Sequence, residues 1–111
     1  VLNLTPYFTS YTISKSALWT LTRTLASAMS PNIRVNAIGP GPTLPSKRQS
    51  DEEFQNQFNA LPLERSVKIS EICEAVEFII DCQSMTGQLI TIDAGQHLGW
   101  AQPGQKIVDA E

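Results

Sequence analysis

Residues 11–41 read YTISKSALWTLTRTLASAMSPNIRVNAIGPG, and this stretch decides the fold. Apolar residues recur at helical spacing in its first part, which predicts an amphipathic helix over about residues 9–29. Pro31 ends that helix, because the residue before a proline is kept out of the helical conformation. Residues 33–38 (IRVNAI) then read as a short β-branched strand. A long helix followed directly by an apolar strand is the second half of a βαβ unit, which predicts an α/β fold with a parallel sheet.

A stiff loop follows this strand. Residues 39–45 (GPGPTLP) hold three prolines and two glycines, which neither continue a strand nor start a helix interior. The loop is placed at the carboxyl end of a parallel strand, where open α/β sheets bind their ligands.

The rest of the chain predicts a lid helix, a second amphipathic helix and a second strand. Residues 50–59 form a short polar helix with a capping box between Ser50 and Glu53, and its narrow apolar stripe is typical of a surface lid. A helix over about residues 70–82 and a strand over residues 88–92 come next. The lid stripe is Phe54, Phe58 and Leu61, and the expected buried face of the later helix is Ile72, Cys73, Val76, Ile79 and Ile80. Two strands are fewer than two long amphipathic helices need, because parallel sheets are covered on both faces.

Composition limits the classes of function. The 111 residues suit one domain, and 8 basic against 11 acidic residues predict no nucleic-acid partner. No apolar run of membrane-spanning length occurs, and the first residues do not resemble a secretory signal, so we expect a cytoplasmic protein without a membrane partner. Cys73 and Cys82 are too far apart on one helix for a disulfide and are expected to be buried thiols. His97 has no acid or thiol partner in the sequence pattern, so no metal site is predicted.

Tyr11 and Lys15 are the strongest candidates for chemistry. Four residues apart near the start of a helix, they lie on the same face. An ammonium group beside a phenol favours the phenolate, which makes such a tyrosine a suitable general acid or base. On this spacing alone, a surface tyrosine beside a solvated lysine remains the simpler interpretation.

Three blocks in order change that interpretation. Residues 11–18 (YTISKSAL), residues 33–41 (IRVNAIGPG) and residues 86–95 (TGQLITIDAG) together resemble the short-chain dehydrogenase/reductase family. The resemblance covers nearly all of residues 7–100, and the loop after the first strand looks most like that of pteridine reductases. It implies the C-terminal part of a Rossmann-like doubly wound parallel sheet, incomplete in this chain.

The resemblance also implies roles by position. Tyr11 matches the proton donor to a carbonyl or imine substrate, and Lys15 matches the lysine that assists it and binds the nicotinamide ribose. Pro40 and Gly41 match the loop that lies against the nicotinamide. Thr43 resembles the threonine whose hydroxyl approaches the cofactor, although the family's usual threonine lies further along, where this chain has Pro45. The implied cofactor is NADP or NAD, with NADP favoured by the subgroup. The implied partner is a small-molecule substrate, for which a pterin-like molecule is one candidate. Asp93 resembles a family position for which a structural role is expected.

Some family features lie outside this sequence. The Gly-rich phosphate turn, the residue that selects NAD or NADP, and the serine or aspartate thirteen residues before Tyr11 have no counterpart here. The expectation is a fragment: residues 1–100 as the C-terminal half of the domain and residues 101–111 as a polar tail. The full-length protein is expected to form a homo-oligomer through its first long helix, where Trp19 is a candidate contact, and through its C-terminal segment. The alternative is a catalytically inactive truncated chain that acts as an interaction module.

Overall fold

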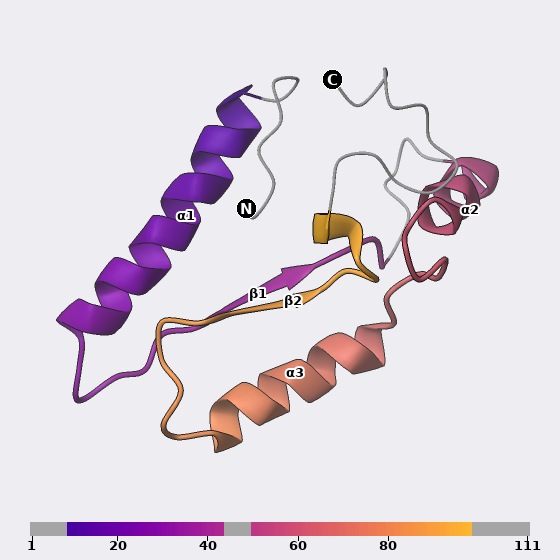
Figure 1. Cartoon of the computed structure of the whole chain (residues 1–111). Coiled ribbons are helices and arrows are strands. Elements are labelled where there is room, and N and C mark those ends of the chain that lie inside the picture. The colour runs from indigo at the N-terminus through magenta and orange to yellow at the C-terminus, as the bar shows by residue number, and fades with distance from the viewer. Residues whose placement is uncertain (1–8, 44–49, 99–111) are drawn as a thin grey trace.

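A computed structural model describes residues 9–43 and 50–98, and Figure 1 shows their arrangement. The elements in chain order are α1 (Thr9–Ala28), β1 (Ala37–Pro40), α2 (Asp51–Asn59), α3 (Ile69–Asp81), β2 (Leu89–Ile92) and the short 3-10 helix η1 (Gln96–Leu98). Helices α1 and α3 lie on opposite sides of the two paired strands (Figure 1). The predicted order of helix, strand, lid helix, helix and strand is confirmed.

The two strands are parallel neighbours. Their register runs from Ala37 opposite Leu89 to Pro40 opposite Ile92. This pairing confirms the expected parallel sheet. The long connection between β1 and β2, which carries α2 and α3, is the crossover that parallel neighbours need.

The predicted bounds of the first strand were wrong. It was expected over residues 33–38, but β1 covers Ala37–Pro40. Before β1 the chain is held partly by side chains: the Val35 N–H donates to the Thr86 hydroxyl at 3.1 Å, and the Gln88 N–H donates to the Asn36 side-chain oxygen at 3.0 Å. A side chain that replaces a main-chain partner interrupts the regular ladder, so the strand starts later than its β-branched residues predict.

Arg34 uses its guanidinium group to close the end of α3. It donates to the carbonyl oxygens of Ile79 at 2.8 Å, Ile80 at 3.0 Å and Met85 at 3.1 Å. The last carbonyl groups of a helix have no partner within the helix, and a cation is favoured there. Arg34 therefore ties the chain entering β1 to the C-terminus of α3.

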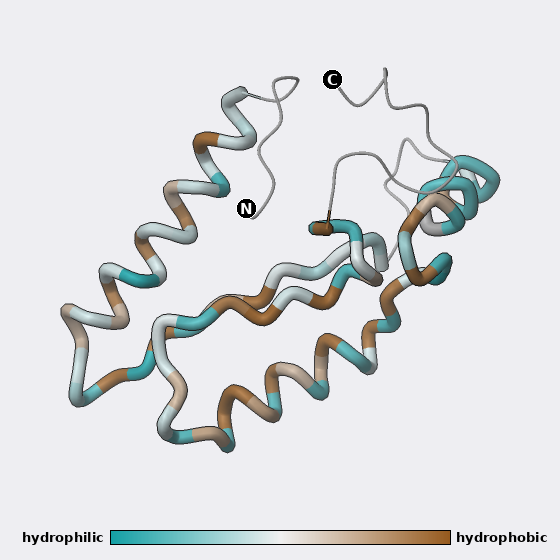
Figure 2. Tube along the Cα trace, in the orientation of Figure 1, coloured by the Kyte–Doolittle hydropathy of each residue, from teal (hydrophilic) through white to brown (hydrophobic). Residues whose placement is uncertain are grey.

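The helix predictions hold within about one residue at each end, but the predicted burial of α3 was largely wrong. Ala75 is its buried residue, whereas Cys73, Val76 and Ile80 are exposed. Two strands cover only a narrow strip of the helix, so the rest of its apolar surface has no cover in the described residues. Figure 2 shows hydrophobic residues along the length of α3, in contrast to the hydrophilic α2.

The lid helix is only partly as expected. The Glu53 N–H donates to the Ser50 hydroxyl at 3.1 Å, which confirms this part of the predicted cap of α2. Leu61, assigned to the surface stripe, is instead 2% exposed and is the most buried large side chain described. The side chain of Phe58 lies outside the described residues, as do Leu44 and Pro45 of the preceding loop. The predicted lid is therefore anchored at its C-terminal end.

Neither cysteine is bonded to another, as predicted, but Cys73 is exposed and Cys82 half-buried, so the expectation of buried thiols was wrong. Among the described residues, no helix is both long and apolar enough to cross a membrane. The expected polar tail at residues 101–111 lies outside the described residues.

Candidate functional site

Tyr11 and Lys15 lie together in the first turns of α1. The Lys15 Nζ atom is 5.4 Å from the centre of the Tyr11 ring, within the range of a cation–π contact. Tyr11 is 61% exposed and Lys15 is half-buried. The helix spacing therefore brings a phenol and an ammonium group together on one face of the helix, as predicted.

The polar ends of this pair make no other contact within the part of the chain that the structure describes. Within the described residues, no hydrogen bond is formed by the Tyr11 hydroxyl or by the Lys15 ammonium group to another side chain or carbonyl. The hydroxyl can give a proton to a bound molecule, and the ammonium group holds positive charge where the phenol would become negative. This is chemistry suited to proton transfer.

The loop after β1 is fixed by main-chain contacts on two sides. The Gly41 N–H donates to the Ile92 carbonyl oxygen at 2.8 Å, and the Val67 N–H donates to the Pro42 carbonyl oxygen at 3.0 Å. A β-carbon on Gly41 would lie 2.6 Å from the Cα atom of Asp93, closer than real contacts of this kind. Glycine is therefore required here because two segments of the main chain approach each other closely. This reason is independent of any ligand.

Pro40 and Thr43 differ in exposure. Pro40 is exposed at the end of β1, and Thr43 is half-buried. Helix α1 begins at the same end of the fold where β1 and β2 finish (Figure 1). Within the described residues, no hydrogen bond joins this loop to Tyr11 or Lys15. Among the described residues, the five predicted site residues thus form two separate groups: Tyr11 and Lys15 on α1, and Pro40, Gly41 and Thr43 at and after the end of β1.

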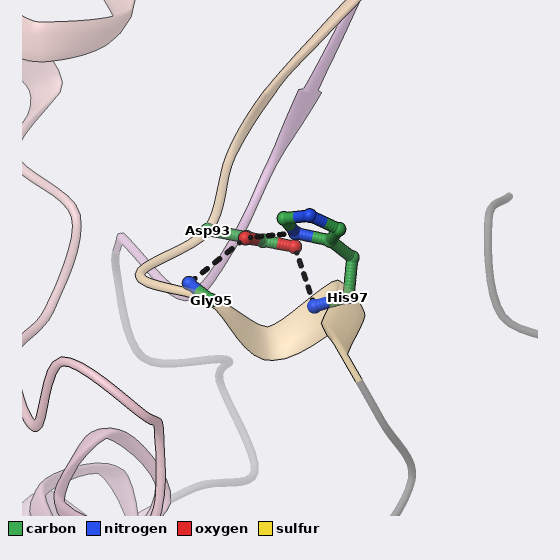
Figure 3. Close-up of polar contacts among 3 residues, drawn as sticks. All are labelled: Asp93, Gly95 and His97. Atoms are coloured by element: carbon green, nitrogen blue, oxygen red, sulfur yellow. Dashed lines mark hydrogen bonds and ion pairs between the residues drawn. The ribbon is translucent and has the colours of Figure 1, made fainter.

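Asp93 and His97 form a polar pair that the sequence analysis missed. Asp93 is 7% exposed, and its Oδ1 atom is 2.8 Å from the His97 Nδ1 atom (Figure 3). The Asp93 carboxylate also accepts the N–H groups of Gly95 at 3.1 Å and His97 at 2.9 Å. The prediction that His97 has no acid partner was wrong. The spacing of four residues in the loop after β2 is the signal that could have found it.

The pair lies on the wall of a cavity. The cavity has a volume of about 270 Å³ and lies beside the end of β2. Its polar and charged lining includes Arg65, Ser66, Glu71, Thr91, Asp93 and His97. In the described part of the chain, no three histidine, cysteine, aspartate or glutamate side chains are grouped closely enough to hold a metal ion.

Sequence comparison places this chain beside known reductases. Residues 2–97 match the profile of a family described as enoyl-(acyl carrier protein) reductase. The short-chain dehydrogenase/reductase homolog YusR of Bacillus subtilis is 36% identical over 89 residues, covering 79% of this chain and 69% of that protein. The dihydromonapterin reductase of Citrobacter koseri is 29% identical over 89 residues, covering 80% of this chain and 37% of the enzyme.

Comparison with solved structures agrees. The FolM alternative dihydrofolate reductase 1 of Brucella suis, solved in complex with NADP, matches with a TM-score of 0.85 and 52% identity. The match covers 95% of this chain and 42% of the Brucella suis chain, so this chain spans about two fifths of that protein. A small-chain dehydrogenase in complex with NADPH matches with a TM-score of 0.66 and 35% identity. The predicted Rossmann-like class of parallel α/β sheet is confirmed.

Proposed function

Because the chain belongs to the short-chain dehydrogenase/reductase family, we propose that it supplies the proton-transfer pair and a cofactor-facing loop of an NADP(H)-dependent reductase. The observation that carries the proposal is the Tyr11–Lys15 pair, 5.4 Å apart from ammonium nitrogen to ring centre, on an exposed face of α1. An exposed phenol with an adjacent cation and no competing hydrogen bond in the described residues fits a group that acts on a bound substrate.

Each residue has a distinct role in this proposal. Tyr11 gives its proton to the oxygen or nitrogen of a carbonyl or imine group as that group is reduced. Lys15 stabilises the phenolate left behind and binds the ribose next to the nicotinamide. When bound, the nicotinamide supplies the hydride. Pro40 and Gly41 would lie against the nicotinamide, and Thr43 would offer a hydroxyl to the same cofactor.

The loop fits a flat cofactor for a physical reason. Its main chain is held on two sides by Ile92 and Val67, so it presents a fixed wall. Pro40 is exposed at that wall and has no side-chain polar group to compete with a ring. Rigid loops at the carboxyl ends of parallel strands are where α/β sheets bind dinucleotides.

The choice of NADP and of a pterin-like substrate has narrower support. The matched Brucella suis protein is described as an alternative dihydrofolate reductase in complex with NADP. The Citrobacter koseri relative is a dihydromonapterin reductase. Both names point to a reduced pteridine ring, so we propose a C=N or C=O bond of such a ring as the reduced group.

The test is Tyr11→Phe in protein expressed with the coding sequence upstream of Val1 included. We expect reduction of a dihydropterin, followed by NADPH absorbance, to fall by at least about a hundredfold, as for loss of a general acid. Tyr7→Phe makes the same chemical change at the other tyrosine of the chain and serves as the control. Turnover unchanged in Tyr11→Phe would overturn the assignment.

A second candidate is an interaction module without catalysis. Leu18, Leu21 and Leu25 are exposed along α1, which favours a helix that associates with another surface. The interaction-module hypothesis predicts that the 111-residue chain shows no measurable NADPH binding in calorimetry. The prediction that this chain is a fragment of a reductase has the same consequence. The two hypotheses differ for the full-length protein: the interaction-module hypothesis predicts no NADPH binding, and the reductase hypothesis predicts binding.

A further inference from the structure

Asp93 has a buried carboxylate whose hydrogen bonds, among the described residues, are all made to its own turn. A buried carboxylate is costly unless donors surround it. Its Oδ1 atom accepts from the Gly95 N–H and the His97 Nδ1 atom, and its Oδ2 atom accepts from the His97 N–H. Figure 3 shows the three bonds converging on one side chain. The carboxylate therefore folds residues 93–97 back onto the end of β2.

The turn that these bonds close has an unusual backbone. Ala94 has φ of 56° and Gly95 has φ of 90°, both in the left-handed region. A non-glycine residue is disfavoured there, so the turn needs bonds that hold it. The Asp93 carboxylate provides them from one side. On the other, the Leu63 N–H donates to the Ala94 carbonyl oxygen at 3.0 Å.

The main chain of the same residue supports the loop after β1. A β-carbon on Gly41 would meet the Asp93 Cα at 2.6 Å and its Cβ at 2.7 Å. The Gly41 N–H is bonded to the carbonyl oxygen of Ile92, the residue before Asp93. The position of Gly41 therefore depends on where the Asp93 main chain lies.

We propose that Asp93 is a positioning residue for the loop at residues 40–42, and that His97 assists it by completing the hydrogen bonds of its carboxylate. The side chain fixes the turn, and the turn sets the surface on which Gly41 rests. The consequence for cofactor binding rests on the proposed function, because only there does this loop lie against the nicotinamide.

The structural test is hydrogen exchange of two amides in the 111-residue chain, read by NMR. In Asp93→Asn, one carboxylate oxygen becomes an NH₂ group that faces donors. We expect the Gly41 amide to exchange about tenfold faster, the usual effect of losing a hydrogen bond to a charged group. The Ala37 amide, bonded to the Gln88 carbonyl oxygen at the far end of β1, should change less than about twofold.

The control is Asp81→Asn, the same substitution at an exposed residue that ends α3. It should leave both amides unchanged. Equal acceleration of the Gly41 and Ala37 amides in Asp93→Asn would indicate a general loss of stability and would overturn the proposal. So would the absence of any change at Gly41.

Two variants of His97 provide a milder test if Asp93→Asn does not fold. His97→Ala removes the side-chain donor but keeps the main-chain one, and we expect about threefold faster exchange at Gly41. His97→Gln offers an amide donor to Asp93 and should restore slower exchange. If His97→Ala leaves the Gly41 amide unchanged, the assisting role of His97 is wrong.

A kinetic measurement separates this inference from the proposed function. In protein expressed with its upstream coding sequence, Asp93→Asn should raise KM for NADPH about tenfold and leave kcat within about twofold. A fall in kcat with unchanged KM would contradict a positioning role toward the cofactor. If the Gly41 amide exchanges faster but KM does not change, Asp93 positions the loop as proposed. In that case the proposed contact between the loop and the nicotinamide is wrong.

Discussion

The Gly41 backbone rests directly on Asp93, so that any β-carbon at position 41 would come within 2.6 Å of the Asp93 Cα atom. The two residues are more than fifty positions apart in sequence and follow neighbouring parallel strands. This contact joins the loop with the proposed cofactor role to the turn that contains the buried carboxylate.

Gly41→Ala tests the contact itself. Because the neighbouring atoms are the Cα, Cβ and carbonyl carbon of Asp93, which cannot move aside cheaply, we expect a loss of about 1–3 kcal/mol in the free energy of unfolding. The measurement is urea denaturation followed by circular dichroism. Gly39→Ala is the matched control, since its β-carbon would meet Leu89 Cδ1 at an ordinary 3.5 Å. Equal losses in the two variants would contradict the steric explanation.

Leu61 should contribute far more to stability than Leu63, although the two leucines flank one proline. Leu61 is 2% exposed and Leu63 is 65% exposed. We expect Leu61→Ala to lower the free energy of unfolding by about 2–5 kcal/mol, because it leaves a cavity. Leu63→Ala should cost less than about 0.5 kcal/mol, as most surface substitutions do. A reversed order in thermal denaturation would show that the end of α2 is not anchored as described.

Arg34 is expected to resist replacement by lysine. Lysine keeps the charge but cannot reach three carbonyl groups with a planar fork. We expect Arg34→Lys to lower the free energy of unfolding by about 1.5–3 kcal/mol, typical of lost bonds to a charged group. Arg23→Lys is the control, because Arg23 is exposed and its one contact in the described part of the chain is with the Trp19 ring, at 5.9 Å from the ring centre. If both variants are equally stable, the hydrogen bonds from Arg34 to the carbonyl oxygens make no measurable contribution to the free energy of unfolding.

Ala94→Gly is expected to stabilise the protein, unlike most substitutions to glycine. Ala94 has φ of 56°, where a β-carbon is unfavourable by about 1–2 kcal/mol. Removing it should raise the free energy of unfolding by up to about 1 kcal/mol after the added flexibility of the unfolded chain is subtracted. Ala17→Gly, at an exposed position inside α1, should instead lower it by about 1 kcal/mol. Opposite signs in the two variants are the expected result, and a loss in both would refute the strain.

The helices of this fold follow from local sequence rules. The apolar spacing predicted α1 and α3 within about one residue, and Ser50 with Glu53 correctly located the start of α2. These signals depend only on residues a few positions apart. The same is true of β2, a short apolar strand between turn residues.

The errors arose where distant residues decide the outcome. The start of β1 depends on Thr86 and Gln88, about fifty residues later, and no local pattern around Val35 contains that information. Leu61 looked like part of a surface stripe because its burial comes from tertiary packing. The expected burial of Val76 and Ile80 assumed a wider sheet than the two strands described.

The candidate site divides in the same way. The Tyr11–Lys15 pair follows from helix spacing and was predicted correctly as a neighbouring pair, while the catalytic roles of the two residues stay predictions. The Asp93–His97 pair was not predicted, because a carboxylate that closes its own turn through a histidine four residues later matches no metal-ligand spacing. Oligomeric state and location in the cell also stay predictions.

The two ends of the short sheet are held by different kinds of contact. At the end where β1 begins, the side chains of Arg34 and Asn36 join it to distant segments. At the other end, main chain meets main chain at Gly41 and Asp93. A hydrogen bond made by a side chain can be replaced during evolution by one from another side chain. At a position where only glycine fits, no other residue can replace it. Sequence variation should therefore be narrowest at the end of the sheet where the loop is, even for variants selected for stability alone.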